Sequence, residues 1–352
     1  MALKAEIKEK ISIEVIKTLI TRFENFPEDA SKNRNAPFHE AFLNAFANKF
    51  EGKVTDVPFF ISMSSWLHGL NTTLGQTFFE NIAYHLSNGE KREYTSKRLG
   101  NLPIRQTQRN QIASTLAKLS YGEELPNLIN EDAFLFTEYE DEIINAMDFS
   151  ADVFIEDNDS VTAIELKSVK PNSGEMRGEK QKILEGKAAL YRLFPNKKIH
   201  FYIGFPFDPT VNPLNEPVTS YNKTRFLNSI INMNKFFAPN ECLLANELWD
   251  FLSGQTNTME EILEIINTIS TPKFLEKFHL LTDNTKRTLP EYRAQLEEWN
   301  LNSELEIIHN TDNILKKIKN DNSLVRIYNK TILNNKGSYN FERYHKLISV
   351  IK

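Results

Sequence analysis

The stretch between residues 151 and 209 most constrains the fold, because short apolar runs alternate there with turn signals and one helical segment. The sequence ADVFIEDNDSVTAIELKSV predicts two strands joined by the turn EDND. GEMRGEKQKILEGKAALYRLF predicts a helix, and KKIHFYIGFPF predicts a third strand that is closed by Pro206 and Pro209. The order strand–turn–strand–helix–strand predicts an α/β core built on a mixed sheet, flanked by helices.

Helical patterns lie on both sides of this core. Residues 5–24 carry apolar side chains at helical spacing, and residues 71–87 do so with a stripe that includes Leu74, Phe78 and Ile82. After residue 215 the pattern is helical throughout. We therefore predict an N-terminal helical region over residues 1–70, a core over 71–215 and a C-terminal helical region over 216–352.

Composition excludes several classes of protein. A chain of 352 residues with 40% hydrophobic and 25% charged residues is typical of a globular protein. The single cysteine, Cys242, excludes an internal disulfide and a Cys-based zinc site. No glycine-rich dinucleotide or phosphate-binding motif is present, so no nucleotide cofactor is expected. The first residues, MALKAEIKEKISIEVIK, lack the apolar core of a signal peptide, and no stretch is long enough to span a membrane, which predicts a cytoplasmic protein.

Charge is arranged in blocks, although the net charge is −5. Residues 164–200 carry nine Lys or Arg against four Glu, and residues 89–111 carry six against two. Residues 121–157 carry twelve acids and no base. Basic faces beside an acidic cluster are expected of a phosphate-binding surface next to a metal site. The alternative is that these blocks form ordinary solvated faces.

Three residues of the predicted hairpin form a recognisable chemical set. Glu165 and Lys167 are two positions apart on one strand, so their side chains point to the same face. The turn can bring Asp152 beside Glu165. Mg²⁺ takes oxygen ligands and usually only one or two carboxylates, so Asp152, Glu165 and the backbone carbonyl of Leu166 form a candidate Mg²⁺ site for phosphodiester hydrolysis. Lys167 would orient the attacking water or stabilise the charged transition state.

A simpler interpretation stands beside this one, since Glu-x-Lys pairs also occur as plain ion pairs on exposed sheet faces. The segment after the strand, SVKPNSGEMRGEKQK, favours the functional interpretation because it is basic and polar. It supplies candidate DNA contacts at Lys170, Asn172, Ser173, Arg177 and Lys180. The alternative is a solvated helix start, with Glu175 and Glu179 pairing Arg177 and Lys180.

The same residues resemble a known family. IELKSVKPNSGEMRGEKQKILEGKAAL, WLHGLNTTLGQTFFENIA and NELWDFLSG are similar to type II restriction endonucleases of the TdeIII-like family, in the PD-(D/E)XK superfamily, from about residue 60 to about residue 255. The resemblance implies a restriction-endonuclease-like fold, Mg²⁺ dependence and cleavage of double-stranded DNA by a homodimer at a short, GGNCC-like palindrome. It assigns Asp152, Glu165 and Lys167 to the catalytic positions and suggests Glu80 as an accessory acid.

Three functions follow from these observations. The first is site-specific cleavage of DNA. The second is a structure-specific or repair nuclease on the same fold, which would cut without sequence preference. The third is a non-catalytic DNA-binding or protein-interaction module, in which the C-terminal helical region makes the contacts.

Overall fold

The computed structural model describes residues 2–27, 37–54, 56–167 and 175–352, and within these ranges the chain forms two compact units. One unit comprises Met1–Leu3 and Phe79–Glu261, and the other comprises Lys4–Phe78 and Ile262–Lys352. The boundaries predicted from sequence, after residues 70 and 215, differ from these divisions. No helix in the described part of the chain is both long and apolar enough to cross a bilayer.

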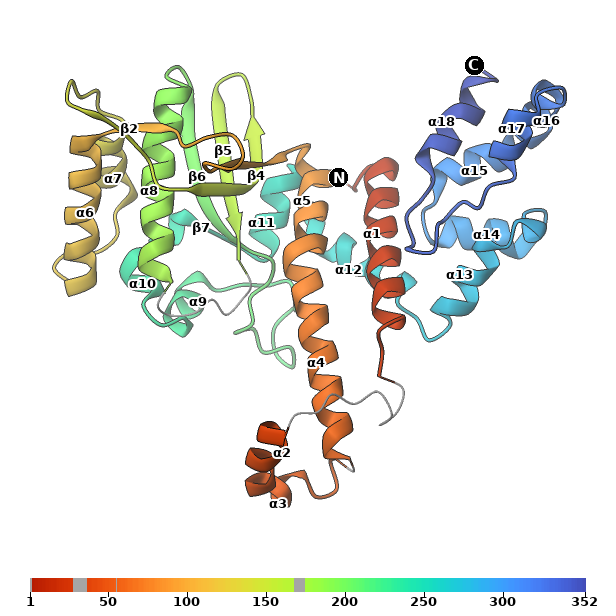
Figure 1. Ribbon diagram of the computed structural model, residues 1–352, viewed down its shortest axis with the longest axis horizontal. Helices are drawn as coiled ribbons and strands as arrows, with labels where there is room; N and C mark the ends of the chain where they lie inside the picture. The colour runs from red at the N-terminus through yellow and green to blue at the C-terminus, as the bar shows by residue number, and fades with distance from the viewer. Residues whose placement is uncertain (1, 28–36, 55, 168–174) are drawn as a thin grey trace. The chain divides into compact units, whose positions relative to one another are not determined.

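The first unit is built on a five-stranded mixed sheet with the strand order β1-β4-β5-β6-β7 (Figure 1). β4 pairs antiparallel with both β1 and β5. β6 pairs in parallel with both β5 and β7. The mixed α/β sheet predicted from sequence is therefore confirmed. The strands are β1 (Glu90–Tyr94), β4 (Phe149–Glu156), β5 (Ser160–Leu166), β6 (Lys198–Phe205) and β7 (Cys242–Leu244), and a separate ribbon joins β2 (Pro103–Arg105) to β3 (Ile143–Asn145).

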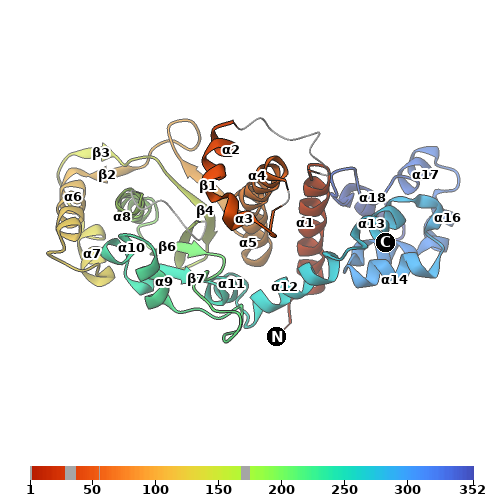
Figure 2. The same ribbon diagram turned by 90° about the horizontal axis from the view of Figure 1, so that it is seen from below.

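Helices cover both faces of this sheet, with α8 on one face and α5 and α11 on the other (Figures 1 and 2). Two glycines permit the close packing. A Cβ at Gly186 of α8 would lie 2.7 Å from the Phe201 ring, and one at Gly204 of β6 would lie 3.2 Å from Leu248 of α11. The helices of this unit are α5 (Phe79–Ser87), α6 (Gln106–Tyr121), α7 (Leu128–Leu135), α8 (Met176–Leu193), α9 (Lys223–Ser229), α10 (Met233–Phe236) and α11 (Asn246–Ser253).

The hairpin that carries the predicted chemistry forms where the sequence places it. Its turn is closed by Asp157, whose backbone N–H donates to the carbonyl of Ser160 at 2.9 Å. Val153 pairs with Ile164, and both are fully buried. The apolar alternation of the two strands thus fixes the register, because a slip by one residue would expose these side chains.

The helix predicted over residues 71–87 differs from the observed structure. Helix α4 (Val57–Thr73) begins much earlier, where the Asp56 side chain accepts a hydrogen bond from the Phe59 N–H at 3.0 Å. A π-helical turn, Leu74–Phe78, then precedes α5. Thr72 and Thr73 lie inside α4, where their hydroxyls donate to carbonyls four residues earlier in the helix. The helix begins at Asp56 because the carboxylate there accepts a hydrogen bond from the first turn.

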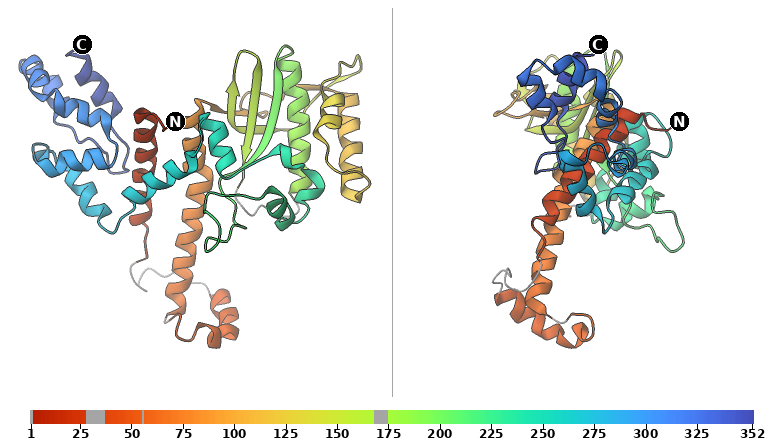
Figure 3. Two further views of the ribbon diagram at one scale, coloured as in Figure 1. Left: turned by 180° about the vertical axis from the view of Figure 1, so that it is seen from behind. Right: turned by 90° about the vertical axis from the view of Figure 1, so that its right-hand side faces the viewer.

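The second unit is helical. Its N-terminal part contains α1 (Ala5–Phe23), α2 (Pro37–Leu43), α3 (Ala47–Phe50) and α4. Consecutive C-terminal helices pack against one another, and α15 also packs against α18 (Figure 3). These are α13 (Phe274–Thr282), α14 (Pro290–Glu298), α15 (Asn302–His309), α16 (Thr311–Ile318), α17 (Asn322–Tyr328) and α18 (Phe341–Ser349), while α12 (Thr258–Ile269) crosses the division between the units.

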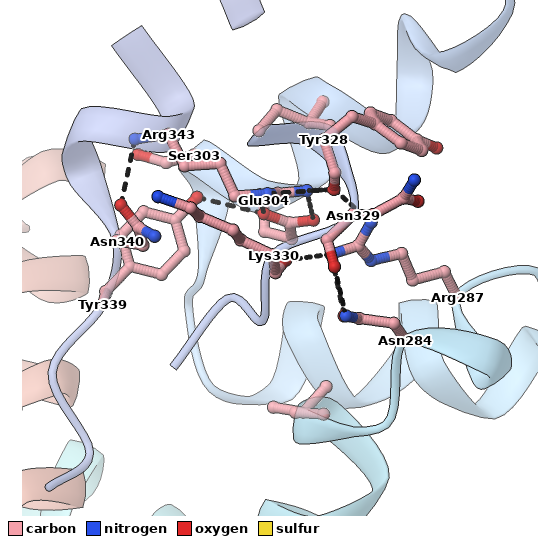
Figure 4. A network of polar contacts seen from close by, with 12 residues as sticks. Asn284, Arg287, Ser303, Glu304, Tyr328, Asn329, Lys330, Tyr339, Asn340 and Arg343 are labelled. Carbon is pink, nitrogen blue, oxygen red and sulfur yellow. Dashed lines mark hydrogen bonds and ion pairs between the residues drawn. The ribbon is translucent and has the colours of Figure 1, made fainter. Parts of the chain in front are cut away.

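A buried ion pair ties the C-terminal helices together (Figure 4). Arg343 of α18 donates to Glu304 of α15 at 2.5 and 3.2 Å, and neither side chain is exposed. The Tyr339 hydroxyl donates to the same carboxylate at 3.2 Å, and the Arg343 guanidinium also reaches the carbonyl of Tyr328 at 3.3 Å. Because every charge in this network is paired, the buried ions are tolerated.

Candidate active site

Asp152 and Glu165 lie one step beyond the Val153–Ile164 pair, at the open end of the β4–β5 hairpin. The Asp152 side chain is nearly buried, and its Oδ2 accepts a hydrogen bond from the backbone N–H of Leu166 at 2.9 Å. The Ser150 hydroxyl donates to Glu165 Oε2 at 3.2 Å. The two carboxylates predicted from sequence are thus held at neighbouring positions of one sheet.

Lys167 follows directly after β5, and its backbone N–H donates to the carbonyl of Gly204 on β6 at 2.9 Å. Its Nζ lies 2.9 Å from Glu165 Oε1, as expected for side chains on one face of an extended strand. The same ammonium lies 3.1 Å from an oxygen of Glu179 on α8. Helix α8 therefore contributes a second carboxylate, that of Glu179, to Lys167. From the sequence we considered Glu179 only as a partner of basic side chains at the start of this helix.

Glu80 joins this group from helix α5, which covers the face of the sheet opposite to α8. It lies in the first turn of α5, and the Lys91 ammonium lies 3.3 Å from its Oε2 and 3.1 Å from Asp152 Oδ1. The Tyr84 hydroxyl donates to Glu80 at 3.4 Å. All four residues predicted as catalytic, Asp152, Glu165, Lys167 and Glu80, are therefore brought into one cluster.

A β-bulge places Lys91, which was not predicted from sequence. On β1 the pair Glu90–Phe154 and the pair Arg92–Ala151 enclose one residue, whereas on β4 they enclose two, Asp152 and Val153. A bulge of this kind bends the strand and redirects its side chains, and such bulges are frequent beside active sites. The only sequence signal for Lys91 is the charged strand EKREY, which gives no hint of a bulge.

The cluster holds more negative than positive charge. Burial raises the pKa of Glu165, and the neighbouring Asp152 carboxylate adds to the rise. The pKa of Glu80 is raised by the same two causes in the same order. Burial lowers the pKa of Lys167, but the carboxylates of Glu165 and Glu179 outweigh it, so the net shift is upward. The ammonium therefore stays charged among acids that repel one another.

These residues fit a divalent metal ion. Within the described ranges, no group of three or more His, Cys, Asp or Glu side chains is arranged to hold a metal. Mg²⁺ does not require such a group, because it usually binds one or two carboxylates and keeps several waters. The carboxylates of Asp152 and Glu165, together with the carbonyl of Leu166, are a donor set of that type. Burial and the neighbouring Asp152 carboxylate raise the pKa of Glu165, as expected at a site that a cation would stabilise.

The predicted DNA contacts fall into three groups. Lys170, Asn172 and Ser173 lie outside the described residues. Arg177 is exposed in the first turn of α8. Lys180 is fully buried, and its ammonium pairs with Glu131 of α7 at 2.6 Å and with Glu241. An ammonium enclosed in this way cannot reach a phosphate, so the expectation for Lys180 is corrected to a structural ion pair.

Comparisons with known proteins identify a family and a relative of this chain. The chain matches the family described as "Type II restriction endonuclease, HinfI" over residues 3–270. It is also similar to the type II restriction enzyme MjaII of Methanocaldococcus jannaschii, with 43% identity over 370 aligned positions that cover 99% of this chain and 98% of that protein. The likeness thus extends through both units and includes the C-terminal helices.

Proposed function

Since the chain belongs to the HinfI family of type II restriction endonucleases, we propose that it cleaves both strands of DNA by Mg²⁺-dependent hydrolysis at Asp152, Glu165 and Lys167. The observation that carries this proposal is the position of the Lys167 ammonium, 2.9 Å from Glu165 at the end of the hairpin that also carries Asp152. We further propose that these residues are the catalytic set of a PD-(D/E)XK nuclease. The narrower TdeIII-like assignment stays a prediction.

Asp152 and Glu165 would hold the metal, with the backbone carbonyl of Leu166 as a third ligand. A divalent ion bound there supplies positive charge at the scissile phosphate and makes a nearby water easier to deprotonate. Asp152 is suited to this role because the Leu166 N–H fixes its Oδ2 and orients its Oδ1. The Ser150 hydroxyl orients the Glu165 carboxylate in the same way.

Lys167 would hold the attacking water and stabilise the negative charge that develops on the phosphate. Its ammonium has two carboxylate partners, Glu165, which is largely buried, and Glu179, which is buried, and they keep it charged and fix its position. Preorganised charge of this kind needs no rearrangement during the reaction. Glu80 shares the Lys91 ammonium with Asp152 and would act as the accessory acid of the same site.

DNA would lie along the start of α8. Arg177 is exposed there, and Lys170, Asn172 and Ser173 precede it in the chain. Side chains of these types donate hydrogen bonds to phosphates and to base edges. We further propose a homodimer on a short palindromic site, GGNCC-like, because the symmetry of such a site is matched by the two-fold symmetry of a dimer. The enzyme would act in the cytoplasm, where incoming DNA is met.

The test is cleavage of phage DNA by the full chain in Mg²⁺, in EDTA, and in Mg²⁺ with Lys167→Ala. Discrete fragments from the wild type in Mg²⁺ alone support the proposal, and sequencing their ends gives the site. Lys167→Ala should bind a short duplex containing that site nearly as well as the wild type but should not cut it. A smear would favour a structure-specific nuclease instead. Normal cutting by Lys167→Ala would disprove the catalytic assignment.

A further inference from the structure

Lys91 stands out among the residues of the cluster because nothing in the proposed chemistry uses it. Its ammonium lies between two carboxylates, 3.1 Å from Asp152 Oδ1 and 3.3 Å from Glu80 Oε2. The bulge at Asp152 and Val153 lies directly opposite Lys91 on the neighbouring strand. The guanidinium of Arg92, the next residue, stacks over the Phe154 ring at 3.9 Å and helps to hold this distorted part of the sheet.

The hydrogen bonds of Asp152 leave its two oxygens in different situations. Oδ2 accepts from the backbone N–H of Leu166, which is a fixed part of β5. Oδ1 faces Lys91. A metal ion bound by Asp152 would therefore use Oδ1, the oxygen that the lysine already contacts. An ammonium and a divalent ion would compete for the same oxygen, because each attracts it through positive charge.

The two lysines of the cluster differ in how firmly they are held. The Lys167 side chain is 19% exposed and lies between carboxylates that are 13% and 8% exposed. The Lys91 side chain is 37% exposed, whereas its partners Glu80 and Asp152 are 16% and 11% exposed. Lys91 can thus swing its ammonium into solvent at small cost, while its partners remain in place.

From these contacts we propose that Lys91 is a built-in counter-ion, which neutralises Asp152 and Glu80 in the metal-free enzyme and competes with the divalent ion for Asp152. The inference rests on the proposed function in assigning the metal to Asp152. In this role Lys91 keeps the acidic cluster stable when metal is scarce and raises the metal concentration at which the site fills. It acts on the site through Asp152 and is a positioning residue.

The test measures metal binding without DNA and without turnover. Mn²⁺ is titrated into the full-length protein, and free Mn²⁺ is followed by electron paramagnetic resonance. Lys91→Met should bind Mn²⁺ about tenfold more tightly than the wild type, since it removes a charged competitor. It should also melt at a lower temperature in EDTA, because Asp152 and Glu80 then lack the counter-ion that they share. Lys97→Met, at an exposed lysine after the same strand, should match the wild type in both measurements.

Two further variants separate the possible failures. Asp152→Asn should weaken Mn²⁺ binding strongly. If it does so but Lys91→Met binds Mn²⁺ no more tightly than the wild type, the role of Lys91 is wrong and the metal assignment stands. If Asp152→Asn binds Mn²⁺ as the wild type does, the metal assignment of the proposed function falls and the inference falls with it. Lys91→Gln carries the same prediction as Lys91→Met should the latter fail to fold.

Discussion

Lys167 lies 3.1 Å from Glu179, so helix α8 reaches across the end of β5 to hold the lysine that the proposed chemistry depends on. Glu179 is itself fixed, because Lys182 donates to its other oxygen at 3.0 Å. The start of α8 is therefore connected both to the proposed DNA-binding segment and to the proposed catalytic lysine. A shift of this helix on binding DNA would move the Glu179 carboxylate and thereby change the position of the Lys167 ammonium.

We expect Glu179→Gln to slow cleavage by about tenfold to hundredfold while binding of the site is retained, since partners of this kind orient the groups they contact. The Glu179 carboxylate also helps to raise the pKa of Lys167. The alkaline limb of the pH–rate profile should therefore move to lower pH in the variant. Single-turnover cleavage across pH measures both effects.

The matched control for this prediction is Glu175→Gln, at an exposed glutamate immediately before the same helix. Its cleavage rate and pH profile should stay close to those of the wild type. A Glu179→Gln enzyme with an unshifted alkaline limb would show that Glu179 does not act through Lys167.

Lys180 and Arg177 should separate stability from DNA binding. Lys180 is fully buried between Glu131 and Glu241, so Lys180→Met leaves two buried carboxylates without their counter-ion. We expect a loss of about 3–5 kcal/mol in the free energy of unfolding. Arg177→Met should leave that free energy nearly unchanged but weaken DNA binding and lower the slope of log K against log salt by about 1. Denaturant unfolding and fluorescence anisotropy measure the two quantities, and a reversed pattern would restore Lys180 as a DNA contact.

Arg177 and Lys180 differ because the surroundings of Lys180 depend on contacts between distant parts of the chain, which the sequence does not predict. The turn EDND and the apolar alternation around it predicted the hairpin, and with it the meeting of Asp152, Glu165 and Lys167, because those effects are local. The partners of Lys180 lie 49 and 61 residues away along the chain, and no local pattern predicts such pairings. The bulge that directs Asp152 toward Lys91 is equally invisible in the sequence, since it depends on how two strands pair.

The buried pair Glu304–Arg343 should contribute strongly to the stability of the helical unit. Arg343→Leu leaves the fully buried Glu304 carboxylate without its counter-ion and should cost about 3–5 kcal/mol of unfolding free energy. The double variant Glu304→Leu/Arg343→Leu should recover part of that loss, because neither charge remains. Glu342→Gln, which breaks the exposed pair with Lys346 on the same helix, should change stability little. Equal losses from the single and double variants would mean that the shape of the site matters more than its charge.

Glu9 should make the stability of the helical unit depend on pH. Burial raises its pKa, although the Ser303 N–H and hydroxyl, at 2.8 and 2.7 Å, favour the charged form. A carboxyl group with a raised pKa in the folded state is ionised more readily in the unfolded chain. Its contribution to stability is therefore greatest at low pH and is lost as pH rises from the ordinary value of 4.5 through the raised one.

Glu9→Gln removes this titration, so the unfolding free energy of the wild type minus that of the variant should fall as pH rises across that window. Glu6→Gln on the same helix is the control with the opposite sign, because its hydrogen bond with Lys10 lowers the pKa of Glu6. For Glu6 the corresponding difference should be small, since the pair is exposed, and should shrink as pH falls below 4.5. Urea unfolding of the three proteins between about pH 3 and about pH 8 measures both slopes. A difference for Glu9 that stays constant across this range would mean that burial does not shift its pKa.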